Sequence, residues 1–164
     1  MLLKDEVTKK TIEPLHFVDV YIKGRLESLN WSPTYFAKKI KVSQGEISKI
    51  LNKERQGLKA DVFYKIYTGF GESCTKATKE VYPDLNLKLN KYTPETRNTF
   101  GKFIQQFEES KNSIEEIAAK TGITETRLRN LYFGKGSPEA FELLLIEKAL
   151  GLKQGELFER LYGE

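Results

Sequence analysis

Side chains that could carry out covalent chemistry are few in this chain and form no catalytic pattern. Its 164 residues include one cysteine, Cys74, and one histidine, His16, which excludes a disulfide within the chain and a zinc site of thiolates and imidazoles. The sequence also contains no glycine-rich phosphate loop, nucleophile motif or constellation of carboxylates. We therefore expect no enzyme, no metal and no cofactor, and we interpret Cys74 and His16 as structural residues.

Hydrogen-bonding side chains are concentrated instead in residues 43–52, which read SQGEISKILN. Ile47, Ile50 and Leu51 recur at helical spacing and predict one buried face. Ser43 is typical of a helix N-cap, and Glu46, three residues later, would complete a capping box. The segment is therefore predicted to be a short helix. A polar helix face of this kind is solvated surface in most proteins, so composition alone does not make it a binding site.

The elements around this segment are predicted from apolar spacing. A first helix precedes it, and a second begins at Ser32, a capping residue, with Pro33 in the first helical position. Lys41 and Val42 form a tight turn into the third helix, and a fourth follows. The buried faces of the first, second and fourth helices are predicted to be Val18, Ile22, Leu26 and Leu29; Phe36, Ala37 and Ile40; and Leu58, Val62, Phe63, Ile66 and Phe70.

The second half of the chain repeats the first. A shift of 81 residues, with no gap between residues 22 and 51, lays Ala37 on Ala118 and Val42 on Ile123. Gly122, which adopts positive φ freely, stands at the turn position that Lys41 occupies with some strain. The repeat predicts N-caps at Ser113 and Thr124 and buried faces at Phe100, Phe103, Ile104 and Phe107; Ile114, Ile117 and Ala118; and Leu128 and Leu131, followed by helices near residues 140–150 and at Leu157 and Leu161.

Residues 43–52 resemble the recognition-helix segment of the phage-repressor family (Cro-like, also called XRE). Ile117-Ala118, Gly122, Ile123-Thr124, Leu128 and Gly134-Lys135 with Pro138 resemble the second motif of that family. The resemblance covers roughly residues 15–70 and 98–160. It implies an all-α fold of two tandem lambda-repressor-like helix-turn-helix domains with four to five helices each. The expected division is an N-terminal arm over residues 1–14, a first domain over 15–84, a linker over 85–94 and a second domain over 95–164.

The resemblance also implies how the first half would touch DNA, because the third helix of this fold enters the major groove. Gln44 can pair with an adenine edge and Lys49 with the acceptors of guanine, and Gly45 would let the backbone come close. Phosphate contacts fix register without reading sequence. The implied base contacts are Gln44, Gly45, Ser48 and Lys49, and the implied phosphate contacts are Ser32, Thr34, Tyr35, Lys53 and Arg55.

In the second half the matching positions imply base contacts from Thr126, Arg127 and Asn130 and a phosphate contact from Arg129. Glu125 either accepts from cytosine or repels phosphate. The charge differs between the halves: residues 1–70 hold 13 Lys+Arg against 8 Asp+Glu, a net +5, whereas residues 99–164 hold 9 against 11, a net −2. Because phosphates attract a protein mainly through charge, the second motif is either a second DNA reader or a unit kept for packing or dimerisation.

Two segments outside the motifs have a simpler interpretation. Lys9 and Lys10 lie in a polar segment that could reach into the minor groove, although a solvated tail is favoured. Residues 85–90, LNLKLN, alternate apolar and polar side chains as an extended strand does. We interpret them as a linker and keep a strand that pairs with another copy as the alternative.

The whole chain has a net charge of +4 and a pI near 9.0, which hints at a polyanionic partner. The expected function is sequence-specific binding of double-stranded DNA by a transcriptional regulator. The alternative is a protein-interaction module, for example an antitoxin-like protein that binds a partner through the same helices. Homodimerisation remains open. With no apolar run long enough for a membrane span and no signal-peptide pattern at residues 1–6, we expect a cytoplasmic protein with no membrane contact.

Overall fold

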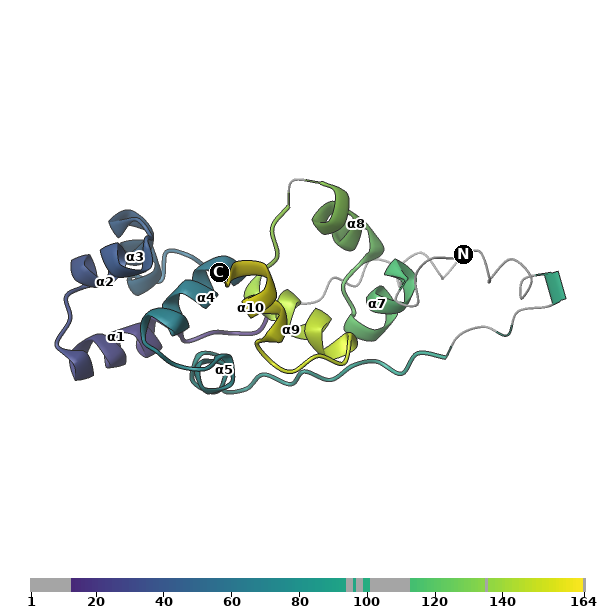
Figure 1. The fold of residues 1–164 in the computed structure, drawn as a ribbon, viewed down its shortest axis with the longest axis horizontal. Coiled ribbons are helices and arrows are strands. Elements are labelled where there is room, and N and C mark those ends of the chain that lie inside the picture. Colours follow the sequence, from purple (N-terminus) through teal and green to yellow (C-terminus); the bar gives the residue numbers. More distant parts are fainter. Residues whose placement is uncertain (1–12, 94–95, 97–98, 101–112, 135, 164) are drawn as a thin grey trace. The chain divides into compact units, whose positions relative to one another are not determined.

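The computed structural model describes residues 13–93, 96, 99–100, 113–134 and 136–163. The regular elements in these ranges are all helices (Figure 1), which confirms the predicted all-α class. None of the helices in these ranges is both long and apolar enough to cross a bilayer. The helices are α1 (Val18–Leu29), α2 (Pro33–Ile40), α3 (Gln44–Leu51), α4 (Ala60–Gly69), α5 (Cys74–Val81), α7 (Ile114–Thr121), α8 (Glu125–Phe133), α9 (Ala140–Ala149) and α10 (Glu156–Tyr162).

The helices begin where the sequence predicts, because a capping side chain stands before each motif helix. A hydroxyl oxygen accepts a hydrogen bond from the backbone N–H three residues later and satisfies a donor that the helix leaves unpaired. The four predicted caps that do so are Ser32, Ser43, Ser113 and Thr124, which accept from Tyr35, Glu46, Glu116 and Arg127.

The two predicted turns are left-handed. Lys41, which joins α2 to α3, has φ 58° and ψ 43°, and Gly122, which joins α7 to α8, has φ 81°. The N–H groups of Lys41 and Val42 donate to the carbonyls of Lys38 and Ala37, so the last turn of α2 is satisfied. A side chain in this backbone region costs about 1 kcal/mol that glycine avoids.

The compact units differ from the linear division expected from the sequence. The larger unit combines residues 12–87 with residues 136–164, and residues 88–135 belong to a smaller unit. The reason is packing: α9 and α10 lie against α4, and the core of the larger unit includes their apolar side chains. The second-half residues buried in this core are Ala140, Phe141, Leu143, Leu144, Leu145 and Phe158.

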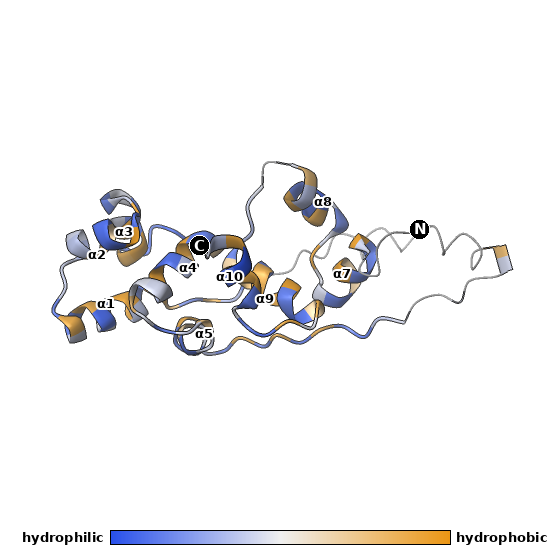
Figure 2. Ribbon diagram, viewed as in Figure 1, coloured by the Kyte–Doolittle hydropathy of each residue, from blue (hydrophilic) through white to orange (hydrophobic). Residues whose placement is uncertain are grey.

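The larger unit therefore contains α1 to α4, which correspond to the four helices predicted for the first half. It also contains α5, and it contains α9 and α10 from the second half. Ile22, Phe36, Phe63 and Ile66 are completely buried at its centre, and all four were predicted to lie on buried faces. Figure 2 shows α9 as mostly apolar with hydrophilic stretches; only Lys148 of its ten residues is exposed. Apolar residues around a whole helix are typical of one that packs on several sides.

The smaller unit contains α7 and α8, which pack on each other. Ile117 and Leu128 are buried, as predicted, and Ile123 of the turn is buried with them, whereas Ile114, Ala118 and Leu131 are only half-buried. The Thr121 hydroxyl donates to the Ile117 carbonyl at 2.6 Å and accepts from the Ile123 N–H at 3.1 Å, which ties the turn together. Phe103, Ile104 and Phe107 of the predicted helix and the arm with Lys9 and Lys10 lie outside the described residues, and Phe100, which was predicted to lie on the same buried face, is 72% exposed.

Residues 85–93 lie outside any helix or strand. Leu85 and Leu87 pack on the core of the larger unit, while Asn86 and Lys88 are exposed. The predicted alternation is therefore real, but its apolar side contacts helices and the segment does not form a sheet.

Candidate functional site

The helix α3 is held by its apolar side and presents its polar side to solvent. Ile47 is 1% exposed and Ile50 is 5% exposed, and α3 packs on both α1 and α2. The close approach of α2 is possible because Ala37 is small and completely enclosed. The outward face is therefore fixed by packing that does not involve its polar residues.

The structure brings the four predicted base-contacting residues of the first half together on this outward face. Gln44, Gly45, Ser48 and Lys49 are all exposed. No atom lies within 4 Å of the position that a Cβ on Gly45 would occupy, so a ligand can reach the backbone there. Ser48 accepts a long hydrogen bond of 3.4 Å from the Asn52 amide and can still donate its own proton. The face thus offers an amide, a hydroxyl and an ammonium group over two turns.

The start of α2 supplies a second polar edge. Ser32, Thr34 and Tyr35 are exposed, and half of the Tyr35 surface is open to solvent. The Ser32 oxygen is used as the N-cap acceptor at 3.0 Å, which leaves its O–H as a donor. The Tyr35 ring rests edge-on against Trp31, with ring centroids 5.3 Å apart. These groups can donate to phosphate oxygens, as predicted.

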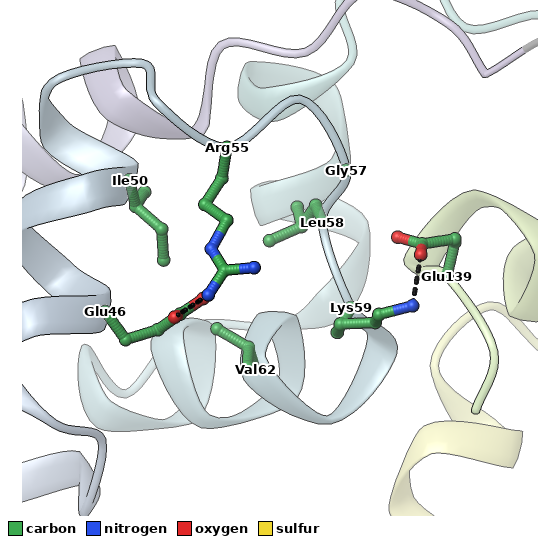
Figure 3. Close-up of a pocket in the computed structure, with 8 residues that line it drawn as sticks. All are labelled: Glu46, Ile50, Arg55, Gly57, Leu58, Lys59, Val62 and Glu139. Carbon is green, nitrogen blue, oxygen red and sulfur yellow. Dashed lines mark hydrogen bonds and ion pairs between the residues drawn. The ribbon is translucent and has the colours of Figure 1, made fainter. Parts of the chain in front are cut away.

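Lys53 and Arg55, the other predicted phosphate contacts, have acidic partners that the sequence reading did not anticipate. Arg55 lies 2.8 Å from the Glu46 carboxylate, and Lys53 lies 3.7 Å from that of the buried Asp19. Glu46 was expected to complete a capping box with Ser43, but its carboxylate reaches Arg55 instead (Figure 3). Lys53 remains 71% exposed and accessible, whereas Arg55 is partly neutralised.

A pocket of about 210 Å³ lies behind α3, between the loop that follows it and the residues before α9 (Figure 3). Its apolar lining comes from Ile50, Leu58 and Val62. Two ion pairs form its sides: Glu46 with Arg55, and Lys59 with Glu139 at 2.5 Å. Because the charged groups that line this pocket neutralise each other, we interpret the pocket as a gap in the packing between helices.

Lysines that were not among the predicted contacts form a basic surface between α2 and α4. Lys39, Lys41 and Lys65 line a shallow hollow of about 280 Å³ whose other lining residues are uncharged. The Lys39 ammonium also lies 5.1 Å from the centre of the Trp31 ring. Residues 32–55 hold six Lys or Arg against two Asp or Glu, a net +4. The run Lys38-Lys39-Ile40-Lys41 was the signal in the sequence that could have revealed this surface.

The corresponding face of α8 differs in chemistry. Thr126, Arg129 and Asn130 are exposed, whereas Arg127 is half-buried. The Asn130 side chain lies against Gly134, where an added Cβ would come within 2.3 Å of its Oδ1. Residues 113–134 hold three Lys or Arg against three Asp or Glu, a net charge of zero. The four predicted contacts of the second half thus lie on one short helix, but the residues around them carry no net positive charge.

Cys74 and His16 each contact other groups of the larger unit. Burial raises the pKa of the Cys74 thiol to about 11, so it is protonated near neutral pH, and its sulfur lies 3.7 Å from the Thr78 hydroxyl. The His16 Nε2 pairs with the Gln56 carbonyl at 2.7 Å. Within the described ranges no group of three His, Cys, Asp or Glu residues could hold a metal ion.

Comparisons of the chain with protein-family models, with curated proteins and with solved structures find no match.

Proposed function

We propose that this protein binds double-stranded DNA sequence-specifically as a transcriptional regulator, through a helix-turn-helix formed by α2 and α3. The observation that carries the proposal is the outward face of α3, where Gln44, Gly45, Ser48 and Lys49 stand exposed on a helix that is fixed from behind. A helix of this length fits the major groove, and its N-terminal residues can meet base edges. The net +4 of residues 32–55 supplies attraction to phosphates.

The contacts divide by chemistry. Gln44 would pair with N6 and N7 of adenine, and Lys49 with N7 and O6 of guanine. Ser32, Thr34 and Tyr35 at the start of α2 would donate to phosphates and set the register, together with Lys53. Arg55 joins them only when it leaves Glu46, since its guanidinium is paired in the free protein.

Equilibrium binding to a pool of random duplexes across a salt series tests this proposal. We expect affinity to fall steeply as salt rises, because bound phosphates release counterions. Lys49→Gln should weaken binding, because an uncharged amide makes a weaker contact with the N7 and O6 acceptors of guanine. Lys79→Gln makes the same charge change at an exposed position of α5 and serves as the matched control. Binding that is absent, or that Lys49→Gln and Lys79→Gln affect equally, would contradict the proposal.

A protein-interaction module is the second candidate, and it is favoured by one feature of α8. Tyr132 and Phe133 are 47% and 78% exposed, with ring centroids 6.2 Å apart. Exposed neighbouring aromatics are common at protein interfaces. Under this candidate the second half binds a protein, and Tyr132→Ala/Phe133→Ala would leave duplex binding unchanged while abolishing co-purification of that protein.

A further inference from the structure

Lys59 and Glu139, two positions of the repeat, meet face to face in the larger unit. A one-residue gap in the repeat after residue 51 reduces its offset there from 81 to 80. Just before α4 and α9, the Ala60 N–H donates to the Pro138 carbonyl at 3.1 Å, and the Ala140 N–H donates to the Leu58 carbonyl at 2.8 Å. These two bonds form an antiparallel bridge between Lys59 and Glu139. Lys59 thus faces the residue 80 positions further along, and each half donates one backbone N–H to the other.

The same offset relates the helices that follow. Ala60 begins α4 and Ala140 begins α9, and each helix spans ten residues. Gly71 and Gly151, again 80 positions apart, both have positive φ, at 69° and 75°. Reciprocal contacts between equivalent positions are the mark of a two-fold interface between identical subunits. Here both sides of such an interface belong to one chain.

The interface is closed by aromatic packing of α10 on α4. The Phe158 ring lies edge-on against Phe63 at 5.8 Å between centroids and against Tyr67 at 6.3 Å. The Tyr64 hydroxyl donates to the Glu159 carboxylate at 2.9 Å. Phe63 and Phe158 are completely buried, so this face of α4 has no room for a second chain.

The charges at the centre of the interface favour pairing of unlike halves. Lys59 faces Glu139 across the bridge and forms an ion pair with it. If two first halves from different chains met in this way, Lys59 would face a second Lys59; two second halves would place Glu139 against Glu139. Like charges directly opposite each other destabilise an antiparallel pair. The sequence thus selects the contact within the chain.

We propose that one chain, and not a homodimer, occupies each DNA site, because α9 and α10 cover the face of α4 that a second subunit would need, and that the site is therefore non-palindromic. This inference rests on the proposed function. The two halves carry different side chains for reading DNA, since α3 exposes Gln44 and Lys49 where α8 exposes Glu125 and Asn130. A single chain presents each set once, and a palindrome requires the same set twice.

Sedimentation equilibrium of the full chain, alone and with its selected duplex, tests the inference. We expect a monomer across a hundredfold range of concentration, and one chain per duplex at saturation. A dimer without DNA, or two chains on a palindromic site, would overturn the inference and leave the proposed function standing. Failure to select any duplex would overturn the proposed function, while the mass of the free protein would still decide whether the interface lies within the chain.

Exchanging the charges of Lys59 and Glu139 tests the interface independently of DNA binding. Lys59→Glu and Glu139→Lys should each lower the urea midpoint of unfolding, and the double variant should regain most of the loss. Lys79→Glu is the control for an equal change of net charge. Mixing the two single variants distinguishes the arrangements: a contact between chains would be repaired by mixing, because opposite charges would meet, whereas the contact within one chain stays repulsive. Recovery on mixing would overturn the inference.

Discussion

The Lys59 ammonium lies 2.5 Å from the Glu139 carboxylate, and the two residues face each other across a backbone bridge between equivalent positions of an internal repeat. Glu139 is also the acidic residue in the pocket behind α3 that comes from the second half of the chain. The pair therefore connects the candidate DNA-reading half with the half that completes its core. Four substitutions in the larger unit test its packing and the candidate DNA-binding face.

Gly45→Ala should separate stability from binding. An added Cβ meets no atom within 4 Å, and alanine is the better helix former, so we expect the free energy of unfolding to rise by about 0.5 kcal/mol. The methyl group would stand between α3 and the bases, so duplex affinity should fall at least about fivefold, which equals about 1 kcal/mol. Urea unfolding and fluorescence anisotropy measure the two effects. A more stable variant with unchanged affinity would place the DNA elsewhere.

Glu46→Gln should strengthen duplex binding several-fold at low salt. The change removes a carboxylate from the basic surface and frees the Arg55 guanidinium, which is 49% exposed and ion-paired at 2.8 Å. Because exposed ion pairs contribute at most about 1 kcal/mol, the fold should hold. The gain should shrink at high salt as charges are screened. Glu27→Gln on α1 is the control, and weaker binding by Glu46→Gln would show that Glu46 orients Arg55 for contact.

Glu72 should make the larger unit sensitive to acid. Desolvation raises its pKa, but hydrogen bonds from Arg25, Lys76 and Tyr21 outweigh this effect and lower the pKa to about 2 from an ordinary value of 4.5. The carboxylate receives Tyr21 at 2.6 Å, Arg25 at 2.7 Å and Lys76 at 2.8 Å. A lowered pKa means that the stabilisation is complete above about pH 4.5 and is lost as the pH falls towards 2.

Glu72→Gln should therefore lower the free energy of unfolding at pH 7 by about 2 kcal/mol, the scale of a hydrogen bond to a charged group. It should also flatten the dependence of stability on pH between about 4.5 and 2. Denaturant unfolding at a series of pH values measures both. A variant as acid-sensitive as the unchanged protein would mean that other carboxylates govern the acid transition.

Gly155→Ala should destabilise the contact between α5 and α10 through two effects. Gly155 has φ +94°, which strains any side chain, and an added Cβ would lie 2.7 Å from the Cβ of Cys74. Gly151→Ala is the matched control, since Gly151 has φ +75° with no atom within 4 Å. We expect a loss of about 1 kcal/mol for Gly151→Ala from strain alone and about 2–4 kcal/mol for Gly155→Ala. Equal losses would contradict the close contact at Cys74.

The local features of the fold could be predicted because they depend on neighbouring residues. Ser43 and Thr124 cap their helices through the N–H groups three residues on. The left-handed turn at Lys41 was predicted from its alignment with Gly122. The helix α5 was not among the predicted helices, because its buried side is formed by small residues. These are Cys74, Ala77, Thr78 and Val81, which give a weaker periodic signal than the leucines and isoleucines elsewhere.

The grouping of α9 and α10 with the first half could not be predicted in the same way. Apolar spacing shows which face of a helix is buried, but it does not show which helix covers that face. Sequence spacing also did not predict the ion-pair partners in the candidate site, because Arg55 pairs with Glu46, nine positions earlier and in another element. It did predict the exposed residues from Gln44 to Lys49, because they follow helical spacing. The packing of α9 and α10 and the pairing of Arg55 therefore depend on contacts between elements, which sequence spacing does not show.

Selection of preferred sites from a random duplex library, with the unchanged protein and with Gln44→Ala, decides whether the outward face of α3 reads duplex DNA. We expect the unchanged protein to enrich one non-palindromic site, and Gln44→Ala to enrich the same site without its preference at the one or two base pairs that Gln44 contacts. Enrichment of no site, or of an identical site by both proteins, would contradict this expectation.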